Sequence, residues 1–200
     1  MKKILHIISS PRGDASYSIR LGNAIIDKIK LAHADSTVKE VNLVAEEYPH
    51  LQESHLAAFF TPPENRTAEN LDVIKPSDDA ISEIMAADII VVGTPLYNFG
   101  IPSNLKAWID HISRAGVTFK FNENGPEGLI KNKKLYIAFS AGGIYENGPM
   151  QSYDTATPYL KSVFGFLGIT DITVVRVEGT SIPGVQESAL TKGIDSILID

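Results

Sequence analysis

The 200-residue sequence contains no cysteine. Disulfide bonds, cysteine-ligated zinc, iron–sulfur clusters and thiol catalysis are therefore excluded. Basic residues are also outnumbered, since 18 Lys and Arg face 24 Asp and Glu, for a formal net charge of -6. Nucleic acid is not expected as a partner, because binding to phosphate backbones requires clustered Lys and Arg.

Long hydrophobic runs are also missing. No stretch approaches the roughly 20 apolar residues that cross a bilayer, and the apolar run 4–8, after Lys2 and Lys3, is too short for a signal peptide. Apolar residues still make up 44% of the chain and charged residues 21%, the balance of a globular protein. We expect residues 1–200 to form a single domain, located in the cytoplasm and without membrane association.

Five short segments have the composition of β-strands. Residues 4–8, 89–93 and 135–139 are nearly continuous apolar runs, typical of strands covered by helices on both faces. Residues 38–43 and 172–177 carry interspersed polar residues, as half-exposed edge strands do. This pattern favours, without proving it, a five-stranded parallel sheet in the flavodoxin-like order 2-1-3-4-5.

Segments with helical periodicity separate these strands. Apolar residues recur at helical spacing in four segments, which span residues 21–32, 105–112, 157–167 and 190–198. The alternation of strands and helices implies right-handed crossovers and a three-layer αβα sandwich. Residues 48–79 interrupt this alternation with a polar, proline-containing stretch. We expect a long irregular excursion there, with a functional or interface role.

Three loops of unusual composition follow the three buried strands. Residues 9–18 are rich in serine, and hydroxyls with free amides at a helix N-terminus can bind an anion, although serines there are also ordinary helix caps. Residues 94–100 contain Tyr and Phe, whose rings are expected to face a cleft. The alternative is that both rings pack into the core and Asn98 fixes a turn. The paired glycines of residues 140–145 allow a ligand close to the backbone, although a flexible turn explains them equally well.

The position of these loops in the sheet matters more than the composition of any one of them. In a 2-1-3-4-5 sheet the loops after strands 1, 3 and 4 are neighbours at the switch point, where flavodoxin-like folds bind FMN. We expect the first loop to hold a phosphate, the second to face an aromatic ring system and the third to donate to its polar edge. The histidines and carboxylates show no metal-ligand spacing, so no metal site is predicted.

The sequence resembles the family of FMN-dependent NADH-azoreductases, relatives of the NAD(P)H quinone dehydrogenases. The most specific parts of the match are six segments, which span residues 95–99, 114–119, 123–129, 140–143, 157–160 and 165–171. The resemblance implies a flavodoxin-like fold, bound FMN, NADH or NADPH as electron donor, and a homodimer with FMN near the interface. It also implies a ping-pong reaction that passes two electrons through FMN to quinones and azo compounds.

The resemblance also implies roles for individual residues. The phosphate-side cofactor contacts are Ser10, Ser16, Tyr17 and Ser18. The ring and ribityl contacts are Leu96, Tyr97, Asn98, Phe99, Ser140, Ala141, Gly142 and Gly143. Asn98 is the candidate for positioning the flavin, and Tyr145, which stands where relatives commonly have His, is the candidate for a proton or substrate contact. Phe119 and Phe121 are candidate substrate contacts from the partner subunit, with core packing as the alternative.

Two other functions remain open at this point. A flavodoxin-type electron carrier would bind FMN without turning over NAD(P)H, although such carriers tend to be shorter and far more acidic. A non-enzymatic FMN-binding redox sensor or scaffold would retain the fold, and slow turnover despite tight FMN binding would favour it. Steady-state oxidation of NADH with a quinone acceptor distinguishes both from an enzyme.

Overall fold

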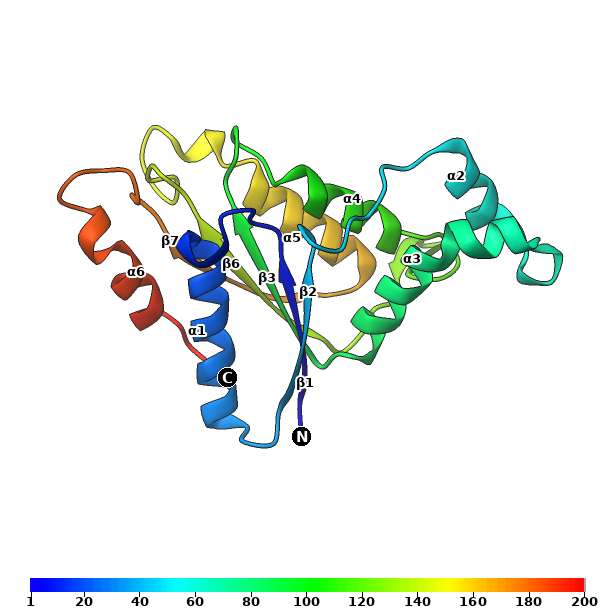
Figure 1. Cartoon of the computed structure of the whole chain (residues 1–200), viewed down its shortest axis with the longest axis horizontal. Coiled ribbons are helices and arrows are strands. Elements are labelled where there is room, and N and C mark those ends of the chain that lie inside the picture. The colour runs from blue at the N-terminus through cyan, green and yellow to red at the C-terminus, as the bar shows by residue number, and fades with distance from the viewer. Residues whose placement is uncertain (200) are drawn as a thin grey trace.

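The computed structural model describes residues 1–199, and its centre is a parallel five-stranded sheet with helices on both faces (Figure 1). The strands lie in the order β2-β1-β3-β6-β7, and numbered along the chain within this sheet they read 2-1-3-4-5. The predicted flavodoxin-like α/β fold is therefore confirmed. The strands are β1 (Lys3–Ile8), β2 (Thr37–Asn42), β3 (Ile89–Pro95), β6 (Lys134–Ser140) and β7 (Asp171–Val177).

Two apolar clusters hold the helices on the sheet, because side chains alternate between its faces along every strand. One cluster joins Ile4, Val91 and Tyr136 to α1 and α6, and the other joins Leu5, Val92 and Phe139 to α3, α4 and α5. The helices are α1 (Tyr17–Ala32), α2 (Glu53–Phe60), α3 (Ala68–Ala86), α4 (Ser103–Ile112), α5 (Ala156–Leu167) and α6 (Gln186–Asp195). Within residues 1–199, no helix is long and apolar enough to cross a membrane.

The prediction that residues 48–79 are irregular is wrong for most of that segment. Helix α2 and the first part of α3 lie within it, and Figure 1 shows α2 at the end of the molecule opposite α6. Pro76 lies inside α3, where proline normally disfavours a helix. Tertiary packing overrides this preference, since Ala58 of α2 and Ile74 of α3 are both fully buried.

A short β-hairpin lies outside the main sheet and was not predicted. It consists of β4 (Phe119–Asn122) and β5 (Gly125–Gly128). A Cβ atom on Gly128 would lie 2.1 Å from the backbone nitrogen of Gly168, which ends α5 with a φ of 107°. Only glycine allows this approach, and the hairpin is thereby fixed to the C-terminal end of α5.

Candidate functional site

The three predicted loops lie side by side at the carboxyl edge of the sheet. Ser9 Oγ, just after β1, donates to the carbonyl of Gly93 in β3 at 2.7 Å. The amide of Leu96, just after β3, donates to the carbonyl of Ser140 at the end of β6 at 2.8 Å. A Cβ atom on Gly93 would lie 3.3 Å from the carbonyl oxygen of Ser18, so glycine here lets the start of α1 sit close to β3.

The first loop gathers buried hydroxyls at the N-terminus of α1. Ser16 caps this helix, because its Oγ accepts from the amide of Ile19 at 3.4 Å, and its Oγ also lies 3.1 Å from that of Ser18. Ser10, Ser16 and Ser18 are all buried. No hydrogen bond between described residues pairs the amides of Tyr17 and Ser18. Serine caps and an anion site are thus compatible here, because free amides and the helix dipole both favour a negative group.

The second loop is a tight turn with an uncommon backbone. Tyr97 and Gly100 exchange two backbone hydrogen bonds of 3.0 Å, and the residues between them, Asn98 and Phe99, have φ values of 48° and 69°. Two successive positive φ values define a type I′ turn, and for a bulky residue such as Phe this conformation is strained. The side chains of Tyr97 and Phe99 are 37% and 44% exposed. Asn98 therefore does fix a turn, but the two aromatic rings do not pack into the core.

The third loop is held in place rather than loose. The amide of Gly179 donates to the carbonyl of Gly143 at 2.8 Å, and the amide of Ser181 donates to that of Gly142 at 3.0 Å. A Cβ atom on Gly142 would lie 2.9 Å from Ser181 Oγ. These contacts favour a fixed loop over a flexible turn. The amides of Gly142 and Gly143 have no protein partner among residues 1–199 and remain available as donors.

Tyr145 lies directly beside the third loop. Its ring is half-buried against the apolar cluster beneath α5, and a Cβ atom on Gly143 would lie 3.2 Å from it. Its amide donates to Glu178 Oε2 at 3.1 Å. The structure therefore brings Tyr145 together with the predicted ring contacts.

Phe119 and Phe121 lie far from these loops within one protomer. The ring of Phe119 packs 4.6 Å from that of Phe166, near the C-terminal end of α5, so core packing explains Phe119 in part. Phe121 is 71% exposed. The three loops are at the other end of α5, and its 12 residues span about 18 Å. Within one protomer, the rings of Phe119 and Phe121 are therefore about one helix length away from the three loops.

A large hollow of about 1010 Å³ opens beside the first two loops. The segment Leu43–His50 and the start of α4 form its other walls. Its lining residues are Ser9, Pro11, Leu43, Val44, Glu47, Tyr48, Pro49, His50, Tyr97, Asn98, Gly100, Ile101, Pro102, Ser103, Asn104 and Ala107. Residues 140–143 do not line it. This size is sufficient for a planar ligand of cofactor dimensions.

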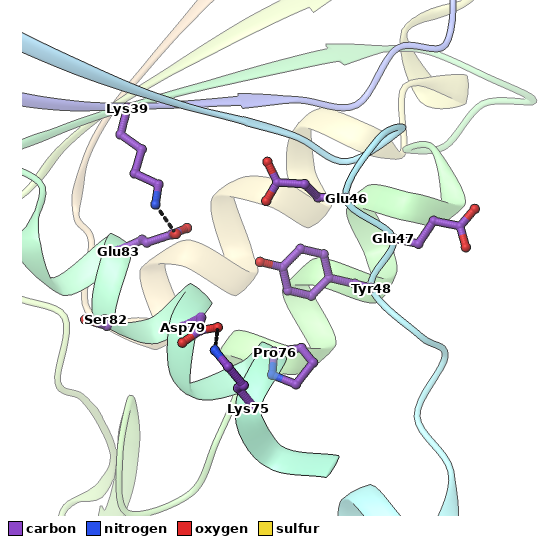
Figure 2. Close-up of a pocket in the computed structure, with 9 residues that line it drawn as sticks. All are labelled: Lys39, Glu46, Glu47, Tyr48, Lys75, Pro76, Asp79, Ser82 and Glu83. Atoms are coloured by element: carbon purple, nitrogen blue, oxygen red, sulfur yellow. Dashed lines mark hydrogen bonds and ion pairs between the residues drawn. The ribbon is translucent and has the colours of Figure 1, made fainter. Parts of the chain in front are cut away.

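A second hollow, of about 520 Å³, lies between β2 and α3 and has a different character. Figure 2 shows its two lysines bonded to carboxylates, Lys39 to Glu83 at 2.6 Å and Lys75 to Asp79 at 2.5 Å. Burial and neighbouring carboxylates raise the pKa of Tyr48 to about 12. Because both lysines are already paired and the phenol stays protonated, this hollow is poorly suited to a phosphate. Within residues 1–199, no cluster of three or more His, Asp or Glu side chains could hold a metal ion.

Sequence reasoning missed an ionic network beside these loops, formed by Arg176 with Asp154 and Glu178. The polar residues of 172–177 were interpreted as those of a half-exposed edge strand. The structure confirms this edge strand as β7, whose residues are mostly half-buried, but the Arg176 side chain within it is only 17% exposed and bonds both carboxylates. The available signal was that Arg176 is the one charged residue of 172–177.

The fold and the three adjoining loops define a flavodoxin-like protein. The chain belongs to the flavodoxin-like fold family, whose model matches residues 2–198. It is 47% identical over 199 residues to an FMN-dependent NADH:quinone oxidoreductase of Herminiimonas arsenicoxydans, with 98% of this chain and 97% of the relative covered.

Solved structures agree with this assignment. The azoreductase of Bacillus anthracis str. Sterne superposes with a TM-score of 0.90 at 33% identity, over 98% of this chain and 96% of the other. An FMN-dependent NADH-azoreductase of Bacillus anthracis str. Ames Ancestor, solved in complex with FMN, has a TM-score of 0.86 at 30% identity, over 98% of this chain and 97% of the other.

Proposed function

We propose that this protein is an FMN-dependent NADH:quinone oxidoreductase that also reduces azo compounds. Electrons enter from NADH or NADPH and leave to a quinone or azo acceptor in a ping-pong cycle, with FMN as the bound carrier. The observation that carries this proposal is the meeting of three unlike loops after β1, β3 and β6. Relatives of the same length, named for the same activity, support it.

The groups at the carboxyl edge fit FMN in their chemistry. The buried hydroxyls of Ser10, Ser16 and Ser18, with the free amides at the start of α1, suit a phosphate. The turn formed by residues 97–100 offers the exposed rings of Tyr97 and Phe99 to a planar ring system. Residues 140–143 offer backbone donors, which favour negative charge on the polar edge of a reduced ring. Tyr17 flanks the phosphate side.

When bound, FMN supplies the two-electron chemistry itself, so the chain needs no acid–base dyad. The protein itself has to bind FMN, orient it and shield it from water. We assign flavin positioning to Asn98, because the turn geometry depends on it. We assign the proton or substrate contact at the polar edge to Tyr145, which lies beside Gly143.

We also propose a homodimer with the cofactor near its interface. Support comes from apolar side chains that one protomer leaves exposed on α2, α3 and the hairpin, namely Leu56, Phe60, Leu71 and Phe121. A second copy would cover them and would bring Phe119 and Phe121 over the flavin as substrate contacts. Sedimentation equilibrium tests this: the wild type should be a dimer and a Phe121→Ser variant should dissociate more readily. A monomeric wild type would exclude the dimer.

We further propose that residues 1–200 act as one flavodoxin-like domain in the cytoplasm. The single parallel sheet and the family match over residues 2–198 support one domain. The proposed use of NADH or NADPH, which are intracellular dinucleotides, supports the location. Limited proteolysis that released a stable separate fragment would contradict the single domain.

The deciding experiment is an absorbance spectrum of the purified protein, followed by anaerobic titration with NADH and with NADPH. We expect a flavin spectrum, bleaching by at least one dinucleotide, and recovery on adding a quinone. An electron carrier would show the spectrum without catalytic turnover, and a redox sensor would show only slow turnover. A colourless protein that cannot be reconstituted with FMN would refute the proposal.

A further inference from the structure

A largely buried arginine connects two of the three loops, and the function proposed above gives it no role. Arg176 of β7 points toward α5, with its guanidinium carbon 4.6 Å from the centre of the Phe139 ring. One nitrogen, Nη1, donates to Glu178 Oε1 at 2.8 Å, and the other, Nη2, donates to Asp154 Oδ2 at 2.8 Å. One planar cation thus bridges two carboxylates.

The Asp154 side of this bridge leads to the second loop. Asp154 Oδ1 accepts from the amide of Thr157 at 2.8 Å, which orders the first turn of α5. Burial alone would raise the pKa of Asp154, but the hydrogen bonds from Thr157 and Arg176 outweigh burial and lower it. The next residue, Thr155, donates to the carbonyl of Phe99 through its amide at 3.1 Å and its hydroxyl at 2.6 Å. The strained turn is therefore anchored at the start of α5.

The Glu178 side leads to the third loop. The second carboxylate oxygen of Glu178 accepts from the amide of Tyr145 at 3.1 Å. The residue after it, Gly179, donates to the carbonyl of Gly143 at 2.8 Å. The carboxylate that binds Arg176 therefore also fixes the loop whose glycine amides remain free.

We propose that Arg176 is a positioning residue of the flavin site. Through its two carboxylate partners it sets the separation of the 97–100 turn and the 140–143 loop. This inference rests on the proposed function, in which those loops hold the FMN ring. A guanidinium suits the task, because its planar fork bonds two carboxylates at once and a lysine ammonium does not reproduce that geometry. Strained backbone such as that of Phe99 persists only while its surroundings hold it, so the turn should relax when the bridge is lost.

The test is the affinity of the apoprotein for FMN and for riboflavin, measured by quenching of flavin fluorescence. Arg176→Lys should weaken both ligands by the same factor, about tenfold, which corresponds to about 1.4 kcal/mol. The factor should be equal because the affected loops face the ring, which both ligands share. Ser16→Ala provides the opposite pattern, since it should weaken FMN and leave riboflavin unchanged.

Arg114 provides a matched control elsewhere in the fold. It is also buried, it pairs with Asp78, and its guanidinium carbon lies 5.0 Å from the centre of the Phe59 ring. Arg114→Lys should therefore lower the free energy of unfolding while leaving the affinity for both flavins as in the wild type. An equal loss of flavin affinity in Arg114→Lys would overturn the specific role of Arg176.

A second variant keeps the inference testable if Arg176→Lys does not fold. Thr155→Val removes the hydroxyl bond to Phe99 at an exposed position and preserves the side-chain shape. It should weaken both flavins and speed hydrogen exchange in residues 97–100. The inference fails, while the proposed function stands, if Thr155→Val binds both flavins like the wild type and Arg176→Lys, provided that it folds, does the same. A wild type that binds no FMN would instead refute the function itself.

Discussion

His6 should make this protein lose stability as the pH falls below neutrality. The residue lies in β1, is only 1% exposed and faces α1, where its Nε2 has no hydrogen-bond partner among the described residues. Gly22 makes room for the ring, because a Cβ there would lie 2.7 Å from Nε2. The nearest acid is Glu40, whose Oε2 is 3.7 Å from Nδ1. Burial lowers the pKa of His6 from 6.5 to about 4.

The sign and size of the effect follow from proton linkage. Between pH 6.5 and about 4 the unfolded chain binds a proton at His6 and the folded chain does not, so stability falls as the pH falls. Above pH 6.5 both states are neutral and the loss vanishes. Each tenfold difference in proton affinity corresponds to ~1.4 kcal/mol, so the loss at pH 4 is about 3 kcal/mol.

The assay is urea unfolding of the apoprotein at several pH values between 7 and 4, followed by the fluorescence of the single tryptophan, Trp108, which is fully buried. His6→Leu replaces the ring with an apolar side chain in an otherwise apolar cluster, and its acid-induced loss should be about 3 kcal/mol smaller than that of the wild type. His33→Leu controls for the removal of a histidine. Parallel loss of stability in the wild type and His6→Leu would refute the reasoning.

Three further predictions concern the hairpin and the loops. Gly128→Ala should destabilise the protein by about 3 kcal/mol because the new Cβ clashes with the end of α5. Gly165→Ala should leave the stability unchanged, because nothing lies within 4 Å of its new Cβ. Equal melting temperatures for the two variants would contradict this. Asn98→Ala should cost about 1 kcal/mol of stability, because alanine is strained at a positive φ, and it should weaken FMN binding. Asn98→Gly keeps the turn and removes only the side-chain amide, so it separates the two contributions. If FMN affinity is unchanged in both variants, Asn98 only forms the turn. Tyr145→Phe should preserve FMN affinity and lower kcat for quinone reduction in stopped-flow assays, and an unchanged kcat would remove the phenol from the reaction.

Much of the fold was predictable because the strands differ in burial. Continuous apolar runs such as 89–93 are typical of strands covered on both faces, and the polar interruptions in 38–43 are typical of an edge, so this pattern favoured the order 2-1-3-4-5 without proving it. The position of the three loops followed from that order. Their composition did not decide between ligand contacts and ordinary turns, which required the backbone geometry of residues such as Asn98.

The rest depended on long-range contacts that local patterns do not encode. The proline-containing stretch 48–79 was expected to be irregular, but burial of α3 against α2 keeps the helix intact around Pro76. Gly128 gave no sign that its backbone meets Gly168, forty residues later. Arg176 does lie in the predicted edge strand, but its partner Asp154 is 22 residues away and meets it only in the folded chain.

The hairpin tip offers a site for a spectroscopic probe. Asn124 is exposed between β4 and β5, and its amide donates to Asn122 Oδ1 at 2.8 Å. Since the chain has no cysteine, Asn124→Cys would introduce a unique thiol for a spin label without any other substitution. The contact between Gly128 and α5 ties that label to the body of the protomer. In a symmetric dimer, the two labels, one on each protomer, would report a single distance, which pulsed electron paramagnetic resonance can measure.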